Sequence, residues 1–124
     1  MKKTMGNLLT LSPRLEQNFY GFADKISDGT YKGGNWLDTE PEEGVIYTKL
    51  QQKEPIKACN HVAYFEKVIS ADAFSIVVNL YFFSALSFKT EGPPQKLACE
   101  RFHKLRAWAL EHHDEAGDIC QLID

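Results

Sequence analysis

The stretch Ser70–Phe88, SADAFSIVVNLYFFSALSF, constrains the fold more than any other part of the sequence. Thirteen of the eighteen residues 71–88 are apolar, and no charged residue follows Asp72 within the stretch. Many of these residues favour strands, but the run is longer than the roughly four to eight residues of a typical strand. Its length therefore predicts a helix. Ser70 is a suitable N-cap, and Asp72 lies in the first turn, where the helix dipole favours a negative charge.

The polar residues of this predicted helix are confined to one side. Asp72, Ser75 and Asn79 recur at helical spacing and form a narrow face, while the remaining faces are largely apolar. A helix with so little polar surface must be buried on several sides, so we predict a central core helix over residues 71–88. A membrane span is the alternative, but the uncharged run falls short of about 20 residues and contains serine and asparagine.

The totals place the chain among ordinary globular proteins. Its 124 residues suffice for one domain with its own hydrophobic core. The net charge of −3 argues against a general nucleic-acid binder, which needs a basic surface. Three cysteines without a CxxC pair fit reduced thiols better than a disulfide framework. The basic N-terminus lacks the long apolar run of a signal peptide, so we expect a cytoplasmic protein.

Periodicity and turn residues predict one helix, about four strands and then three helices. This order predicts an α+β fold: a single domain, 1–124, in which a small antiparallel sheet of about four strands packs with helices. Residues 1–11 are predicted to be loosely ordered. The first predicted helix opens at Ser12-Pro13 and ends at 27–29. The predicted strands are 35–39 and 45–50, which form a hairpin, and 55–60 and 62–69, with a turn at 60–61. After the central helix, we predict a helix from 94 or 95 to about 112 and a last helix, 115–123, capped by Asp114.

No pattern of single residues predicts an enzyme. Cys99 and His103 share a helix face and could supply two metal ligands, but a third and fourth would have to come from elsewhere. His112 and His113 are adjacent and point to different faces of a helix, so they make a poor ligand pair. The chain has no HExxH motif, no nucleophile elbow and no conspicuous carboxylate pair. We therefore predict no catalytic residue, no metal and no cofactor.

Two features near the predicted hairpin could have a binding function, and each also has a purely structural explanation. Gly33 and Gly34 could cradle a phosphate, but the chain lacks GxGxxG there, and a bulge or tight turn is favoured. Trp36, just after them, is expected to be a core or rim aromatic. The segment 38–43 carries four acids in six positions and could mimic DNA phosphates, although a solvated loop is far commoner. These four acids are Asp38, Glu40, Glu42 and Glu43.

Several stretches together resemble the ArdB/KlcA antirestriction family, in the right order and over roughly residues 19–124. They are Tyr20-Gly21-Phe22-Ala23-Asp24 with Tyr31-Lys32-Gly33-Gly34-Asn35-Trp36, Gly44-Val45-Ile46-Tyr47, Ser70-Ala71-Asp72-Ala73 with Ile76-Val77 and Leu80, and Phe102-His103-Lys104-Leu105-Arg106-Ala107-Trp108-Ala109 followed by Glu111-His112 and Ile123-Asp124. The chain departs from the family at its shortened N-terminus, which lacks a Phe-Pro-rich segment. It also departs at Asn35 and residues 37–38, where the family prefers aromatics. It thus resembles a divergent member.

The resemblance implies a small protein of mobile elements that counters host type I restriction without hydrolysing anything. It implies binding to a protein of the restriction or another defence system. It also marks Asp124 as the counterpart of the family's final-helix aspartate, which is a functional candidate; the alternative is that a terminal aspartate is solvated and frayed. We expect the working surface to combine residues from the hairpin and the C-terminal segment. A ligand- or protein-binding module without a defence role is the alternative, and an apolar pocket near Trp36, Tyr47 and Tyr64 would favour it. The expected surface consists of Gly33, Gly34, Trp36, Asp38, Glu40, Glu42, Glu43, Glu111, Asp114, Asp118 and Asp124.

Overall fold

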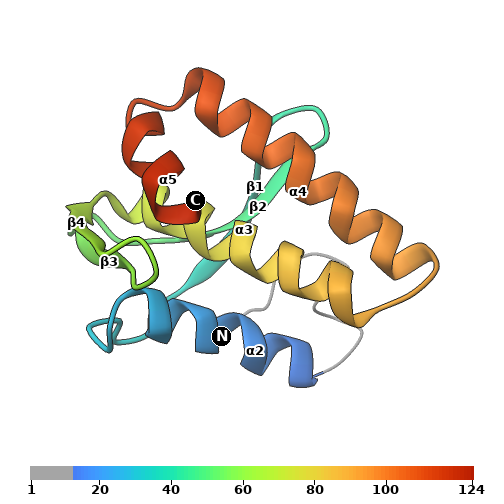
Figure 1. Cartoon of the computed structure of the whole chain (residues 1–124), viewed down its shortest axis with the longest axis horizontal. Helices are drawn as coiled ribbons and strands as arrows, with labels where there is room; N and C mark the ends of the chain where they lie inside the picture. The colour runs from blue at the N-terminus through green and yellow to red at the C-terminus, as the bar shows by residue number, and fades with distance from the viewer. Residues whose placement is uncertain (1–12) are drawn as a thin grey trace.

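The computed structural model describes residues 13–124, and the elements are labelled as in Figure 1. The α+β class predicted from the order of the elements is confirmed. The helix predicted to open at Pro13 is present, whereas its predicted cap, Ser12, and residues 1–11 lie outside the described residues. The elements are α2 (Pro13–Ile26), β1 (Trp36–Glu42), β2 (Val45–Leu50), β3 (Ile56–Asn60), β4 (Phe65–Ile69), α3 (Ala71–Lys89), α4 (Pro93–His112) and α5 (Ala116–Ile123).

Helix α3 is the centre of the fold, as its sequence predicted. The Ser70 hydroxyl accepts a hydrogen bond from the backbone N–H of Ala73 and caps the helix. The helix is long and apolar enough to cross a membrane, but most of it is buried inside the molecule. It contacts helices α2, α4 and α5 as well as strands β2 and β3, and Figure 1 shows it running between α2 and α4. The apolar faces of α3 thus form the middle of the core.

The narrow polar face of α3 is buried as well, because it binds the backbone of β2. The Asn79 side chain accepts a hydrogen bond from Thr48 N–H at 3.0 Å and donates one to the Thr48 carbonyl at 2.7 Å. One turn earlier, the Ser75 hydroxyl accepts the N–H of Leu50 at 2.8 Å. An unpaired strand edge would leave these buried backbone groups unsatisfied. The side chains of α3 therefore take the place of a neighbouring strand.

This arrangement explains why the four strands do not form one sheet. Strand β2 pairs antiparallel with β1 on one edge, while α3 occupies its other edge. Strand β3 consequently pairs with β4, and the described residues contain two separate antiparallel hairpins. The first hairpin packs against α3 and α4, and the second against α5. The four predicted strands are thus present, but they are divided between two two-stranded sheets.

Two strand boundaries differ from the sequence prediction. Strand β1 continues through the acidic segment to Glu42, past a bulge between Thr39 and Glu42, so most of the predicted loop is strand. Strand β4 begins only at Phe65, because the Asn60 side chain accepts the N–H groups of Val62 and Ala63 and holds a turn. Tyr64 has a φ of 55° in this turn and its side chain is exposed.

The predicted Asp114 cap of the last helix is wrong. Helix α5 begins one residue later than expected, and Glu115 occupies its N-cap position without a capping hydrogen bond from its side chain. The Glu115 carboxylate instead accepts hydrogen bonds from the backbone N–H and the hydroxyl of Ser70, at 3.1 and 2.5 Å. The start of α5 is therefore tied to the start of α3, and Asp114 is left exposed.

Candidate functional site

A network of polar side chains joins β2, the start of α3 and the turn between α4 and α5. Asp72 lies at its centre and accepts hydrogen bonds from the Tyr47 hydroxyl at 2.5 Å and from His113 Nε2 at 2.9 Å. Lys49 Nζ lies 3.6 Å from the same carboxylate. On the other side of the imidazole ring, the backbone N–H of Glu115 donates to Nδ1 at 3.0 Å. The network positions the C-terminal segment relative to the core.

Electrostatics within this network favour a charged Asp72. Burial pushes the pKa of Asp72 upward, but the hydrogen bonds from His113 and Tyr47 outweigh it and hold the pKa below its ordinary value. Burial and the same carboxylate raise the pKa of Tyr47, which stays protonated as a donor. The hydrogen bond to Asp72 raises the pKa of His113 against the opposing effect of burial. The backbone N–H of Glu115 donates to Nδ1, so the neutral ring with its proton on Nε2 can bind both neighbours.

The His113–Asp72 pair predicts how the free energy of unfolding depends on pH. The pKa of His113 is higher in the folded state, so its stabilisation is complete below the ordinary value of 6.5 and is lost as the pH rises through the folded value. Asp72 acts oppositely, and its contribution is lost only in acid, below 3.8. We expect urea denaturation to show a free energy of unfolding that declines above pH 6.5.

Two histidine variants make this measurement specific. His113→Gln should flatten the decline above neutral pH, because the titrating group is removed. His103→Gln, at an exposed position on α4, should leave the decline unchanged. Equal slopes in wild type and His113→Gln would contradict the assignment.

Three of the predicted surface acids converge on a groove between the first hairpin and α4. Glu42 at the end of β1, Glu43 in the turn after it and Glu111 near the end of α4 line this groove together with Lys104 and Trp108. Its volume is about 300 Å³, and Val45, Ala107 and His112 complete its lining. The groove brings together acids that are 68 residues apart in the chain, counted from Glu43 to Glu111. We call it the acidic groove.

The residues before and within the hairpin have mainly structural roles. Gly33 and Gly34 have φ values of 93° and 141°, and a Cβ on Gly34 would lie 2.9 Å from the Leu50 side chain. Trp36 is fully buried, and its indole N–H donates to the Tyr31 hydroxyl, so it belongs to the core and not to an exposed surface. Glu40 accepts the N–H of Gly44 in the hairpin turn.

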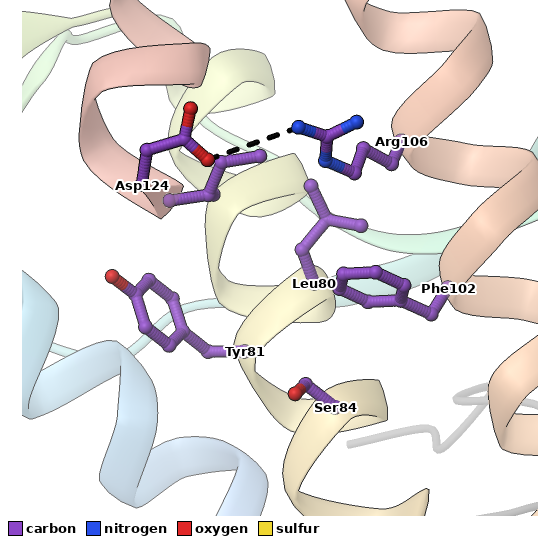
Figure 2. A pocket seen from close by; sticks show the side chains of 7 residues that line it. Leu80, Tyr81, Ser84, Phe102, Arg106 and Asp124 are labelled. Carbon is purple, nitrogen blue, oxygen red and sulfur yellow. Dashed lines mark ion pairs between the residues drawn. The ribbon is translucent and has the colours of Figure 1, made fainter.

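The remaining predicted acids are dispersed. Asp38 accepts a hydrogen bond from the Thr48 hydroxyl across the hairpin. Asp118 of α5 forms a 3.0 Å ion pair with Lys67 of β4. Asp124 lies at the end of α5, where its carboxylate is 3.8 Å from the Arg106 guanidinium of α4 (Figure 2). The predicted surface is therefore split, and only the acids of the acidic groove share one recess.

The pocket that would favour a simple ligand-binding module near Trp36, Tyr47 and Tyr64 does not form. Trp36 and Tyr47 are buried in the core, whereas Tyr64 is 94% exposed at the tip of the second hairpin. Within residues 13–124, no three side chains of histidine, cysteine, aspartate or glutamate are grouped to hold a metal ion.

Sequence reasoning missed the roles of Asp72, Tyr47 and His113. The polar face containing Asp72 was visible, but its partners lie 25 and 41 residues away in the chain. No local periodicity connects such positions. The one available signal was a carboxylate at the start of an otherwise apolar helix, which requires partners when buried.

Comparison with known proteins supplies the family. The sequence profile of a family described as "Antirestriction protein" matches residues 29–124. No curated protein matches the chain. A solved structure from work on KlcA and ArdB is similar over 98% of this chain and 93% of its own, with a TM-score of 0.75 and 22% sequence identity. That work describes a novel fold and antirestriction activity against type I DNA restriction systems in vivo but not in vitro. Because the profile covers most of the sequence, the chain belongs to the antirestriction protein family.

Proposed function

We propose that this protein counters a type I restriction system inside the cell by binding a protein of that system, without catalysing a reaction. The family match over residues 29–124 carries the proposal, and the similarity of fold to the KlcA and ArdB structure supports it. We propose further that the protein acts in the cytoplasm of a host that carries a mobile element. The described residues offer no grouped metal ligands, and the network around Asp72 is occupied with internal bonds.

The acidic groove is the surface best suited to contact the partner. Glu42, Glu43 and Glu111 are exposed, and Trp108 adds an aromatic surface beside them. Aromatic residues in recesses commonly contribute much of the binding energy of protein interfaces, and surrounding charges steer association. The groove carries only three acids, together with Lys104, which is too few to imitate a DNA duplex with one charge per about 1.7 Å along a long axis. A basic segment of a restriction protein is the complementary partner.

Neutralising the groove should reduce protection against restriction. We expect the triple variant Glu42→Gln, Glu43→Gln, Glu111→Gln to lose about tenfold or more of the protective effect, because charged rim residues govern association. The measurement is the plating efficiency of unmodified phage on cells with a type I system. These three side chains are exposed, so the protein should remain folded and soluble.

A matched triple variant separates the groove from net charge. Asp24→Asn, Glu54→Gln, Glu91→Gln removes the same number of negative charges at exposed positions outside the groove. It should protect as well as wild type. Undiminished protection by the groove variant would show that the acidic groove does not contribute to antirestriction. The antirestriction role itself is tested separately, with the wild-type protein.

A further inference from the structure

A second recess, which we call the C-terminal pocket, lies between α3, α4 and the end of α5. Leu80 of α3, Phe102 of α4 and Ile123 of α5 supply its apolar wall, and its volume is about 150 Å³. Figure 2 shows Arg106 and Asp124 at one side of this pocket, with their charged groups directed toward each other, and Ser84 at the opposite side. The pocket thus has an apolar body and one polar edge.

The polar edge presents a donor beside an acceptor. The guanidinium of Arg106 can only donate hydrogen bonds, and the carboxylate of Asp124 accepts them when ionised. Their closest N–O distance is 3.8 Å, longer than a hydrogen bond, and both side chains are partly exposed. A cation or an anion in the pocket would bind one of these groups and face a like charge on the other. The complementary ligand is therefore neutral and carries an acceptor next to a donor.

Two further polar groups near the pocket, on Tyr81 and Cys120, are already bonded. The Tyr81 hydroxyl donates to the Leu122 carbonyl at 2.6 Å, which fixes the end of α5 against α3. The Cys120 thiol donates to the other oxygen of Asp124, at 3.2 Å. These contacts hold the Asp124 carboxylate at the rim, with one oxygen facing Arg106. The edge is accordingly positioned before any ligand arrives.

Size selects the ligand. A cavity of about 150 Å³ lined by aliphatic and aromatic side chains accommodates one benzene-sized ring. Pyrimidine bases are single six-membered rings with such an edge, because cytosine has an amino group next to a ring nitrogen and uracil has a ring N–H next to a carbonyl. Enzymes that hold single bases use this combination of edge hydrogen bonds and apolar or aromatic contact. We propose that the C-terminal pocket binds a pyrimidine base.

The proposal goes beyond the antirestriction role and does not depend on it. The base could come from a free nucleoside or from a single-stranded nucleic acid. In both cases the ring enters the apolar body, the Arg106 guanidinium donates to its acceptor, and the Asp124 carboxylate accepts from its donor. The net charge of −3 means that phosphate contacts contribute little to binding.

Titration of the isotopically labelled full chain with cytidine or uridine, followed by NMR, tests the proposal. We expect the backbone signals of Leu80, Ser84 and Ile123 to shift, with a Kd on the order of 1 mM, as suits a fragment-sized ligand. Benzene has a ring of the same size and no hydrogen-bonding group, and it should bind at least about tenfold more weakly because the hydrogen bonds of the edge are lost.

Three variants complete the test. Arg106→Met keeps the aliphatic stem but removes the donors, and Ser84→Trp fills the pocket, so both should abolish the shifts caused by cytidine. Lys96→Met, at an exposed position on α4 outside the pocket, should leave them unchanged. Retention of cytidine binding by Arg106→Met, equal binding of benzene, or absence of shifts at the pocket would overturn the proposal.

A short oligonucleotide identifies the source of the base. If a single-stranded hexamer of deoxycytidine shifts the same signals at lower concentration per base than cytidine does, the ligand is single-stranded nucleic acid. If it binds no better than cytidine, the ligand is the free nucleoside. Both results support a pyrimidine site. The assay involves no restriction enzyme, so its failure would leave the proposed antirestriction function untouched.

Discussion

Asn79→Leu is expected to lower the free energy of unfolding by about 3 kcal/mol. Leucine branches at Cγ as asparagine does and is the larger side chain, so no cavity forms. It cannot, however, bind Thr48, whose buried N–H and carbonyl both pair with the Asn79 side chain. Each buried backbone group left without a partner costs about 1–3 kcal/mol. Urea denaturation measures the loss.

The matched control is Ser87→Ala, further along the same helix. The Ser87 hydroxyl bonds only to the Ser84 carbonyl within α3, so its removal should change stability by less than about 1 kcal/mol. If Asn79→Leu were as stable as wild type, the side chains of α3 would not be holding the edge of β2. The explanation that α3 prevents the four strands from forming one sheet would then be wrong as well.

Trp36→Ala is expected to cost about 3–5 kcal/mol. The indole is fully buried and contacts Phe19 edge to face, with ring centroids 5.0 Å apart. Alanine would leave a large cavity and would remove the donor to the Tyr31 hydroxyl, now at 2.8 Å. The measurement is again urea denaturation, with far-UV circular dichroism to establish that the variant folds.

The adjacent residue provides the comparison. Leu37 is 42% exposed, so Leu37→Ala should cost less than about 1 kcal/mol. Similar losses for the two variants would contradict the core position of Trp36. Gly33 and Gly34 lead into Trp36 at the start of the first hairpin. Such a result would therefore also mean that a buried Trp36 does not anchor this hairpin.

Local patterns predicted the helices of this fold well. Helix α3 could be predicted because its length, its Ser70 cap and its apolar faces all indicate the same element. The four strands were recognised from composition and turn residues. Their division into two sheets could not be, because it depends on side chains of α3 that bind the β2 backbone 25 and 31 residues away. Hydrogen bonds of this kind leave no local periodicity.

The site was less predictable than the fold. Acidic composition alone could not distinguish Glu42, which joins the acidic groove, from Asp38, which bonds within its hairpin. From the sequence alone, Trp36 is compatible with either a core or a rim position, and only its packing in the folded chain distinguishes the two. Burial and long-range pairing decided each case, and both arise only once the chain is packed.

The most direct test of the central claim is the plating efficiency of unmodified phage on cells with an active type I restriction system, with and without this protein. We expect expression of the protein to raise plating substantially, while phage carrying the host modification plate equally in both strains. Unchanged restriction in cells that accumulate soluble, folded protein would contradict an antirestriction role against that system.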